Sequence, residues 1–199
     1  MRILGLVAAM LVAGPVAAEC PVAADLETGI RFDVDEGDSE VFRSLRPGVV
    51  EAIYSHADGG ATRTLLGQGV YLLELVEMAG KEPDPSTRMT YAFPQNAEDL
   101  PRPVPGSTAQ FELLRNENGS LEREVQSYDF GPQARATFDA CTYDMIPIEI
   151  RYPDEDRARR DVLHYLPQLG LSAAFFLDGL GLLFAGMILG VDFRRYVNR

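Results

Sequence analysis

The chain has 199 residues and a formal net charge of -12 at pH 7. This length suits one domain with a core of ordinary size. Lys81 is the only lysine, and an acidic surface repels a phosphate backbone, so the composition argues against nucleic-acid binding. We interpret the acidity as a contribution to solubility.

Residues 1–18 have the features of a secretory signal peptide. A positive start precedes an apolar run over residues 3–12, and the Val-Ala-Ala triplet at 16–18 places small residues where a signal peptidase reads. We expect cleavage before Glu19. Lipid attachment at Cys20 is disfavoured because that modification needs a small residue just before the cysteine. The sequence therefore predicts export to the periplasm.

Cys20 and Cys141 are the only cysteines, and both lie in the part expected to be exported. An oxidising compartment favours a disulfide bond between them. Closing so long a loop would stabilise the fold by about 4 to 5 kcal/mol in the chain-entropy picture. A redox-active pair would more often be a local Cys-x-x-Cys, and two cysteines without a histidine cluster do not form a zinc site. We therefore expect a structural disulfide, no metal and no cofactor.

Between Gly29 and about Leu166 the apolar residues recur with period two, which is typical of half-buried strands. Turn sequences separate these runs, and Asn118-Gly119 is the clearest hairpin turn. This pattern predicts an all-β domain over residues 19–168, an antiparallel sandwich or a partly closed barrel. Strands are expected at 29–34, 39–45, 49–55, 61–66, 70–78, 86–92, 108–115, 120–128, 134–143, 145–152 and 161–166.

A proline-rich stretch at 93–107 divides these strands into two groups. Prolines cannot donate to a strand ladder, so the stretch is expected to be a loop crossing the surface. A lid or binding loop is the alternative. We do not interpret it as a domain boundary, because the expected disulfide joins the two groups.

Catalytic candidates are few, because the only histidines are His56 and His164. His56 stands beside a turn and is expected to be solvated, and His164 alternates with apolar residues in a strand pattern. No Gly-x-Ser-x-Gly elbow is present to supply a serine nucleophile. The acidic stretch at 33–38 does not match an EF-hand loop, because glycine comes at the fifth position instead of the sixth. The sequence predicts no catalytic residue and no metal ligand.

The stretch from Leu171 to Val191 has 21 residues, of which 15 are apolar and four are glycine. As a helix it would measure about 31 Å, enough to cross a hydrocarbon core of ~30 Å. We expect an apolar, membrane-spanning helix at 169–193 that contacts membrane lipid. The short basic tail at 194–199 would then lie in the cytoplasm by the positive-inside rule.

Asp178 is the objection to a membrane span, since it costs roughly 2.5 to 3.5 kcal/mol near the bilayer centre. Two alternatives follow: an apolar hairpin that turns at Asp178-Gly179, or a helix buried against the β domain. If the segment spans, Gly179, Gly186 and Gly190 offer a close-packing face with Asp178 at its edge. Such a face suits a membrane-protein partner or self-association.

These features predict a non-catalytic exported envelope protein, attached to the cytoplasmic membrane, whose periplasmic domain binds or scaffolds. The alternative is a soluble periplasmic binder of a small apolar or lipidic ligand, in which 171–191 completes the fold.

Overall fold

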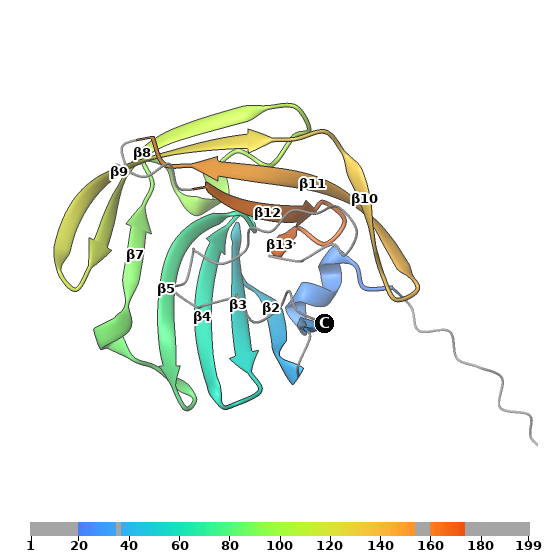
Figure 1. The fold of residues 1–199 in the computed structure, drawn as a ribbon, viewed down its shortest axis with the longest axis horizontal. Coiled ribbons are helices and arrows are strands. Elements are labelled where there is room, and N and C mark those ends of the chain that lie inside the picture. Colours follow the sequence, from blue (N-terminus) through green and yellow to red (C-terminus); the bar gives the residue numbers. More distant parts are fainter. Residues whose placement is uncertain (1–19, 35–36, 154–159, 174–199) are drawn as a thin grey trace, which may run out of the picture.

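The structure is a computed structural model that describes residues 20–34, 37–153 and 160–173. These residues form one antiparallel sheet of 13 strands that is not closed (Figure 1). The predicted all-β, antiparallel class is therefore confirmed. The sheet is continuous and it bends. Its first and second halves therefore face each other.

A short 3-10 helix, η1 (Ala23–Glu27), precedes the first half of the sheet, in which β1 to β5 are neighbours in chain order. Tight turns join β2 to β3, β3 to β4 and β4 to β5, as the turn sequences predict. A two-stranded extension and a second 3-10 helix lead from there to β7. The elements are β1 (Ile30–Asp33), β2 (Ser39–Arg46), β3 (Val49–His56), β4 (Gly60–Gly67), β5 (Tyr71–Ala79), β6 (Glu82–Pro83), η3 (Pro85–Thr87) and β7 (Met89–Ala92).

The second half continues from β7 through β8, β9, β11 and β12 to β13, while β10 pairs with β11 beside β9. The β8–β9 hairpin turns at Asn118-Gly119, where both residues have positive φ, which confirms the predicted turn. The elements are η4 (Ala97–Asp99), β8 (Thr108–Glu117), β9 (Ser120–Phe130), β10 (Ala134–Phe138), β11 (Cys141–Arg151), β12 (Arg160–Leu166) and β13 (Leu171–Ala173).

The two halves pack against each other through the apolar side of each strand. In Figure 1, β11, β12 and β13 cross over the ends of β2 to β5. Phe42 and Val50 from the first half share one buried cluster with Leu166, Leu169 and Leu171 from the second. We call the side of the sheet that carries these residues the inner face. Successive side chains of a strand point to opposite faces of the sheet. The apolar residues that recur at every second position of the sequence therefore lie on this inner face.

A second cluster fills the bend of the sheet with aromatic rings. The ring of Tyr71 lies edge-on to Tyr128, with centroids 4.9 Å apart, and its hydroxyl donates a 2.8 Å hydrogen bond to the Pro101 carbonyl. Leu100 is buried in the same cluster. The stretch at 93–107 is thus the expected loop, and it packs onto the sheet within the same domain.

Gly69 and Gly170 bring the two halves of the sheet together at one end. Gly69 has φ +71°, and a Cβ atom there would lie 2.2 Å from the Gly170 carbonyl oxygen. The Ser172 amide donates a 2.8 Å hydrogen bond to the Gly69 carbonyl. The backbone of β13 therefore closes tightly onto the turn between β4 and β5, where only a glycine fits.

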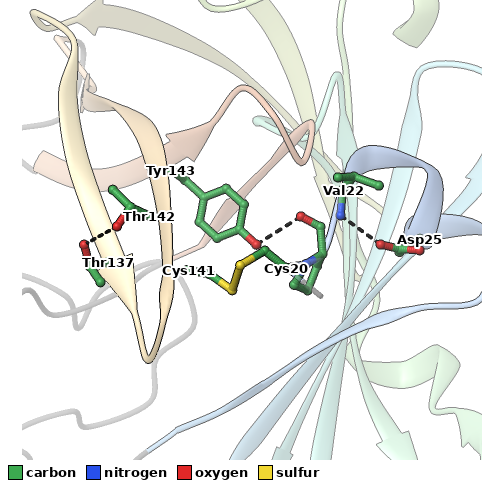
Figure 2. The surroundings of a disulfide bond; sticks show 8 residues. Cys20, Val22, Asp25, Thr137, Cys141, Thr142 and Tyr143 are labelled. Atoms are coloured by element: carbon green, nitrogen blue, oxygen red, sulfur yellow. Dashed lines mark hydrogen bonds between the residues drawn. A yellow bond between two sulfur atoms is a disulfide. The ribbon is translucent and has the colours of Figure 1, made fainter. Parts of the chain in front are cut away.

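The Cys20–Cys141 disulfide joins the start of the described chain to the first residue of β11 (Figure 2). The two Cα atoms are 5.5 Å apart, within the range that disulfides adopt. Next to it, the Tyr143 hydroxyl donates a 3.0 Å hydrogen bond to the Pro21 carbonyl. The Val22 amide donates to the Asp25 carboxylate at 2.8 Å. These bonds fix the chain before η1, and the predicted disulfide is confirmed.

Two sequence expectations need adjustment. The strand expected at 134–143 is interrupted at Asp139, whose φ of 50° places it in a turn between β10 and β11. The apolar helix was expected from residue 169, but Leu169 lies in a turn and Leu171–Ala173 form β13. The rest of that segment, 174–193, lies outside the described residues. Within the described ranges, the structure contains no helix with the length and apolarity needed to cross a membrane.

Candidate functional site

Polar side chains gather at two places on the inner face, beyond the apolar clusters. The Glu40 cluster, in the first half of the sheet, consists of Asp38, Glu40, Tyr54 and His56. The Asp161 cluster, in the second half, consists of Glu124, Gln126, Tyr128, Tyr152 and Asp161. Both are defined by the side chains that neighbouring strands place on one face, and they differ in how fully their hydrogen bonds are satisfied.

The register of β1, β2 and β3 places Glu40 between two aromatic residues. Glu40 is paired with Phe32 on β1 and with Tyr54 on β3. Phe42, two residues further along β2, is fully buried in the core. Because positions two apart share a face, Glu40 also points to the inner side, one step beyond the apolar core.

Asp38 is the most buried member of the cluster, with 5% of its surface exposed. Its carboxylate accepts a 2.6 Å hydrogen bond from the Tyr54 hydroxyl and a 2.8 Å hydrogen bond from the Ala57 amide. The Nδ1 atom of His56 lies 3.5 Å from the same carboxylate, and the His56 ring stands edge-on to the Tyr54 ring. Asp38 thus holds the tyrosine and the histidine in place.

Glu40 differs from Asp38 because its carboxylate has no comparable hydrogen bonds. Among the described residues, none donates a hydrogen bond to it. Burial raises the pKa of Glu40 from 4.5 to about 7, because the charged form loses its hydration. At neutral pH this carboxyl is therefore divided between its neutral and ionised forms. The ionised form of such a carboxyl can pair with a positively charged group of a ligand, or it can take up a proton from the ligand.

The polar character extends from Glu40 across the next two strands. Thr62 on β4 is paired with Tyr54, and Glu77 on β5 is paired with Thr62. The Thr62 hydroxyl lies 3.2 Å from both oxygens of the Glu77 carboxylate and donates to them. The inner face therefore changes from an apolar core to a polar row running from β2 to β5.

The side chains of the Asp161 cluster are buried and joined by hydrogen bonds. The Tyr152 hydroxyl donates to the Asp161 carboxylate at 2.6 Å, and the Tyr128 hydroxyl donates to the Gln126 carbonyl at 2.6 Å. The Gln126 amide in turn donates to the Glu124 carboxylate at 2.5 Å. Burial raises the pKa of Tyr128 well above its usual value, so this phenol stays protonated. We interpret this cluster as structural, because satisfied buried networks specify a fold.

The outer face of the sheet carries ion pairs. Arg63 on β4 bridges Glu51 at 2.6 Å and Glu74 at 2.9 Å, and Arg88 reaches Glu74 at 3.5 Å. These side chains neutralise one another across β3, β4, β5 and the start of β7. Among the described residues, no group of three or more histidine, cysteine, aspartate or glutamate side chains is arranged to hold a metal ion.

Neither of the two surface hollows described next coincides with the Glu40 cluster. A groove of about 510 Å³ lies where β7 separates from β8, and it includes Phe93, Leu114 and Arg123. A smaller one of about 180 Å³ lies between Gln110 and Arg151. Both are open to solvent, and neither contains a member of the Glu40 cluster. The Glu40 cluster is the stronger candidate because it combines ordered aromatic neighbours with a carboxylate to which no described residue donates a hydrogen bond.

The residues singled out in the sequence have different outcomes. Cys20 and Cys141 form the expected disulfide. His56 was expected to be solvated, but it is half-buried beside Asp38. His164 is half-buried on β12, opposite Pro147. The predicted helix-packing residues lie outside the described part of the chain: Asp178, Gly179, Gly186 and Gly190.

Sequence reasoning missed Glu40, Tyr54 and the approach of Asp38 to His56. Counting outward from the Pro47-Gly48 turn would not have found them, because a bulge between Ser44 and Arg46 shifts the register of β2 against β3 by one residue. Comparison with known proteins adds no assignment: no protein-family model matches the chain, and no curated protein or solved structure is significantly similar to it.

Proposed function

We propose that this chain is a non-catalytic envelope protein whose β domain is exported, lies in the periplasm and acts as a binding or scaffolding module. The leader-like residues 1–18 are consistent with this placement. The disulfide between Cys20 and Cys141 suits an oxidising compartment. The proposed binding role draws on the Glu40 cluster, in which the Glu40 carboxylate lies on the inner face and accepts no hydrogen bond from the described residues.

We further propose that the apolar stretch after β13 holds this domain to the cytoplasmic membrane. The observation that carries this proposal is the position of β13, which is the last strand at one edge of the open sheet. The last described residue, Ala173, therefore lies in an edge strand. Residues 174–193 would extend about 30 Å as a helix, which still matches a hydrocarbon core of ~30 Å.

The alternative is a soluble periplasmic binder of a small apolar or lipidic ligand, in which 171–191 completes the fold. One observation favours it: the start of this segment is already part of the domain. Leu171 is fully buried in the core, and the Ser172 amide is bonded to Gly69. If the following residues continued in the same way, the segment would close the domain instead of leaving it.

Cell fractionation of the full precursor separates the two proposals. The protein should stay with the membranes after a carbonate wash, because a spanning helix cannot be washed off. Leu183→Arg, which adds a second charge to the apolar stretch, should reduce that retention. Leu121→Arg, at an exposed position near the β8–β9 turn, is the matched control and should leave retention unchanged. Release of the unmodified protein with the periplasmic fraction would contradict the anchor and support the soluble binder.

A further inference from the structure

We propose that Asn118, at the tip of the β8–β9 hairpin, is a deamidation site, and that the side chain of Asn116 controls how fast the reaction occurs. The products would be aspartate and isoaspartate, the isomer in which the backbone continues through the side-chain carboxyl. This modification goes beyond the proposed binding role and is independent of the membrane anchor.

The residue after Asn118 favours this chemistry. The chain contains four asparagines, at positions 96, 116, 118 and 198, and only Asn118 is followed by glycine. A side chain on the following residue would hinder the attack of its backbone nitrogen on the asparagine side chain. Gly119 has none, and even a Cβ atom there would meet nothing within 4 Å. Both residues are exposed, so water and hydroxide reach them.

The reaction needs only water and base. Hydroxide removes the proton of the Gly119 amide, and the nitrogen attacks the Cγ atom of Asn118. The bond from Cγ to the side-chain nitrogen breaks, and ammonia leaves after taking a proton from water. The product is a five-membered succinimide ring, which water opens at one of its two carbonyls to give aspartate or isoaspartate. Each modified chain gains one negative charge.

The geometry of the hairpin tip opposes this reaction. Asn118 and Gly119 have φ values of 52° and 84°, the conformation of a tight two-residue turn. The Gly119 amide donates a 3.1 Å hydrogen bond to the Oδ1 atom of Asn116. This bond keeps the proton on the attacking nitrogen and fixes the orientation of the peptide between Asn118 and Gly119. Asn116 is therefore a positioning residue that slows the attack.

Asn116 is itself held on both sides. It is half-buried and paired with Thr90 on β7 and with Leu121 on β9. Beyond it, the tip continues only through the pair of Glu117 and Ser120, both of which are exposed. Short exposed segments open locally without unfolding the rest of a domain. The rate at Asn118 should therefore report the opening of the tip alone.

Isoaspartate would change the hairpin. It adds one carbon atom to the backbone of a two-residue turn, and hairpin register depends on the length of the turn. The pair of Glu117 and Ser120, next to the turn, should be lost first. Aspartate would keep the backbone length and add a carboxylate beside Glu117 in the sequence.

The test incubates the full mature chain at pH 8 without denaturant and follows the modification by mass spectrometry. Trypsin cleaves after Arg115 and Arg123 and releases the peptide 116–123, which contains both hairpin asparagines. Replacement of the amide nitrogen by oxygen raises the mass at Asn118, and fragmentation of the peptide separates this signal from Asn116. Isoaspartate and aspartate forms of the peptide are then resolved by chromatography.

Asn116→Ala should speed the modification about threefold or more, because one ordinary hydrogen bond changes a rate by roughly two- to tenfold. Asn116→Asp keeps an acceptor oxygen and should react as slowly as the unmodified chain. Asn96→Ala removes an exposed asparagine from the loop before η4 and is the matched control, with no change in rate expected.

Hydrogen exchange shows whether the effect is local. In Asn116→Ala the Gly119 amide should exchange faster, while the amide of Phe111, a buried residue of β8, should be unchanged. Equal acceleration at both amides would indicate loss of the fold and overturn the inference. Equal modification rates in Asn116→Ala and the unmodified chain, or modification of Asn96 as fast as that of Asn118, would overturn it as well.

Discussion

The Ser172 amide donates a 2.8 Å hydrogen bond to the carbonyl oxygen of Gly69. These two residues lie far apart in sequence, Ser172 in the edge strand β13 and Gly69 in the turn between β4 and β5. Their contact holds the two halves of the open, bent sheet together at one end, where the Gly170 carbonyl leaves no space for a side chain on Gly69.

Gly69→Ala should destabilise the domain by about 3 kcal/mol or more, because it combines a left-handed backbone with a clash against backbone atoms. The Gly119→Ala variant is the matched control. Gly119 also has positive φ, but a Cβ there meets nothing within 4 Å, so only the backbone term of about 1 kcal/mol remains. Urea unfolding of both variants measures the difference. Equal losses would show that the Gly69–Gly170 contact is unimportant.

The disulfide should contribute strongly to stability because it joins residues 121 positions apart. Replacing both cysteines, as Cys20→Ser with Cys141→Ser, should lower the free energy of unfolding by about 4 to 5 kcal/mol. Denaturant unfolding with and without reductant measures this effect. Reductant should destabilise the original chain and leave the double variant unchanged. A double variant as stable as the oxidised chain would contradict a structural role for the bond.

Arg63→Met should cost about 1 to 2 kcal/mol, because it leaves the half-buried carboxylates of Glu51 and Glu74 without their shared cation. Arg123→Met removes the partner of Glu112 from an exposed pair and should change stability by less than about 0.5 kcal/mol. Chemical unfolding at low salt gives both values. A larger loss for Arg123→Met than for Arg63→Met would reverse the expected order.

Glu40 should make stability depend on pH. In the folded state its pKa is about 7, against 4.5 for an unperturbed carboxyl, so between these values the folded chain holds a proton that the unfolded chain has released. The contribution of Glu40 to stability is therefore full below pH 4.5 and is lost as pH rises to about 7. Glu40→Gln cannot ionise and avoids this loss.

We therefore expect Glu40→Gln to be more stable than the unmodified chain at pH 8, by on the order of 2 kcal/mol, and nearly equal to it at pH 4.5. Thermal or urea unfolding at the two pH values measures the difference. Glu112→Gln, on the exposed outer face, is the control and should show no such pH-dependent gain. A Glu40→Gln variant that is less stable at pH 8 would show that the charged carboxylate is satisfied in the folded chain.

Much of the sheet could be predicted because the sequence alternates apolar and polar residues and separates its strands with clear turns. Asn118-Gly119 is an example, since both residues tolerate the positive φ that a tight hairpin needs. The turn at Asp139 was missed because alanine follows the aspartate where glycine would have marked a turn. Strand β13 was missed because three buried strand residues cannot be told from the start of an apolar helix by composition.

The candidate site was harder to predict than the fold. Asp38 occurs in an acidic stretch that resembles a solvated turn, and His56 stands beside another turn. Only the register of β2 against β3 brings them to 3.5 Å and places Glu40 beside Tyr54. The pKa of Glu40 is raised because neighbouring strands exclude water from its carboxyl. This exclusion exists only in the assembled sheet, so the sequence alone does not reveal it.

The disulfide also determines how the molecule would respond to proteolysis. Cys20 and Cys141 enclose β1 to β10 and the loop at 93–107 within one covalent ring. A single peptide-bond cleavage inside that ring opens it without releasing a fragment, so the nicked chain would keep all its strands. Such damage would pass unnoticed on a non-reducing gel and become visible as two bands only after the thiols are reduced.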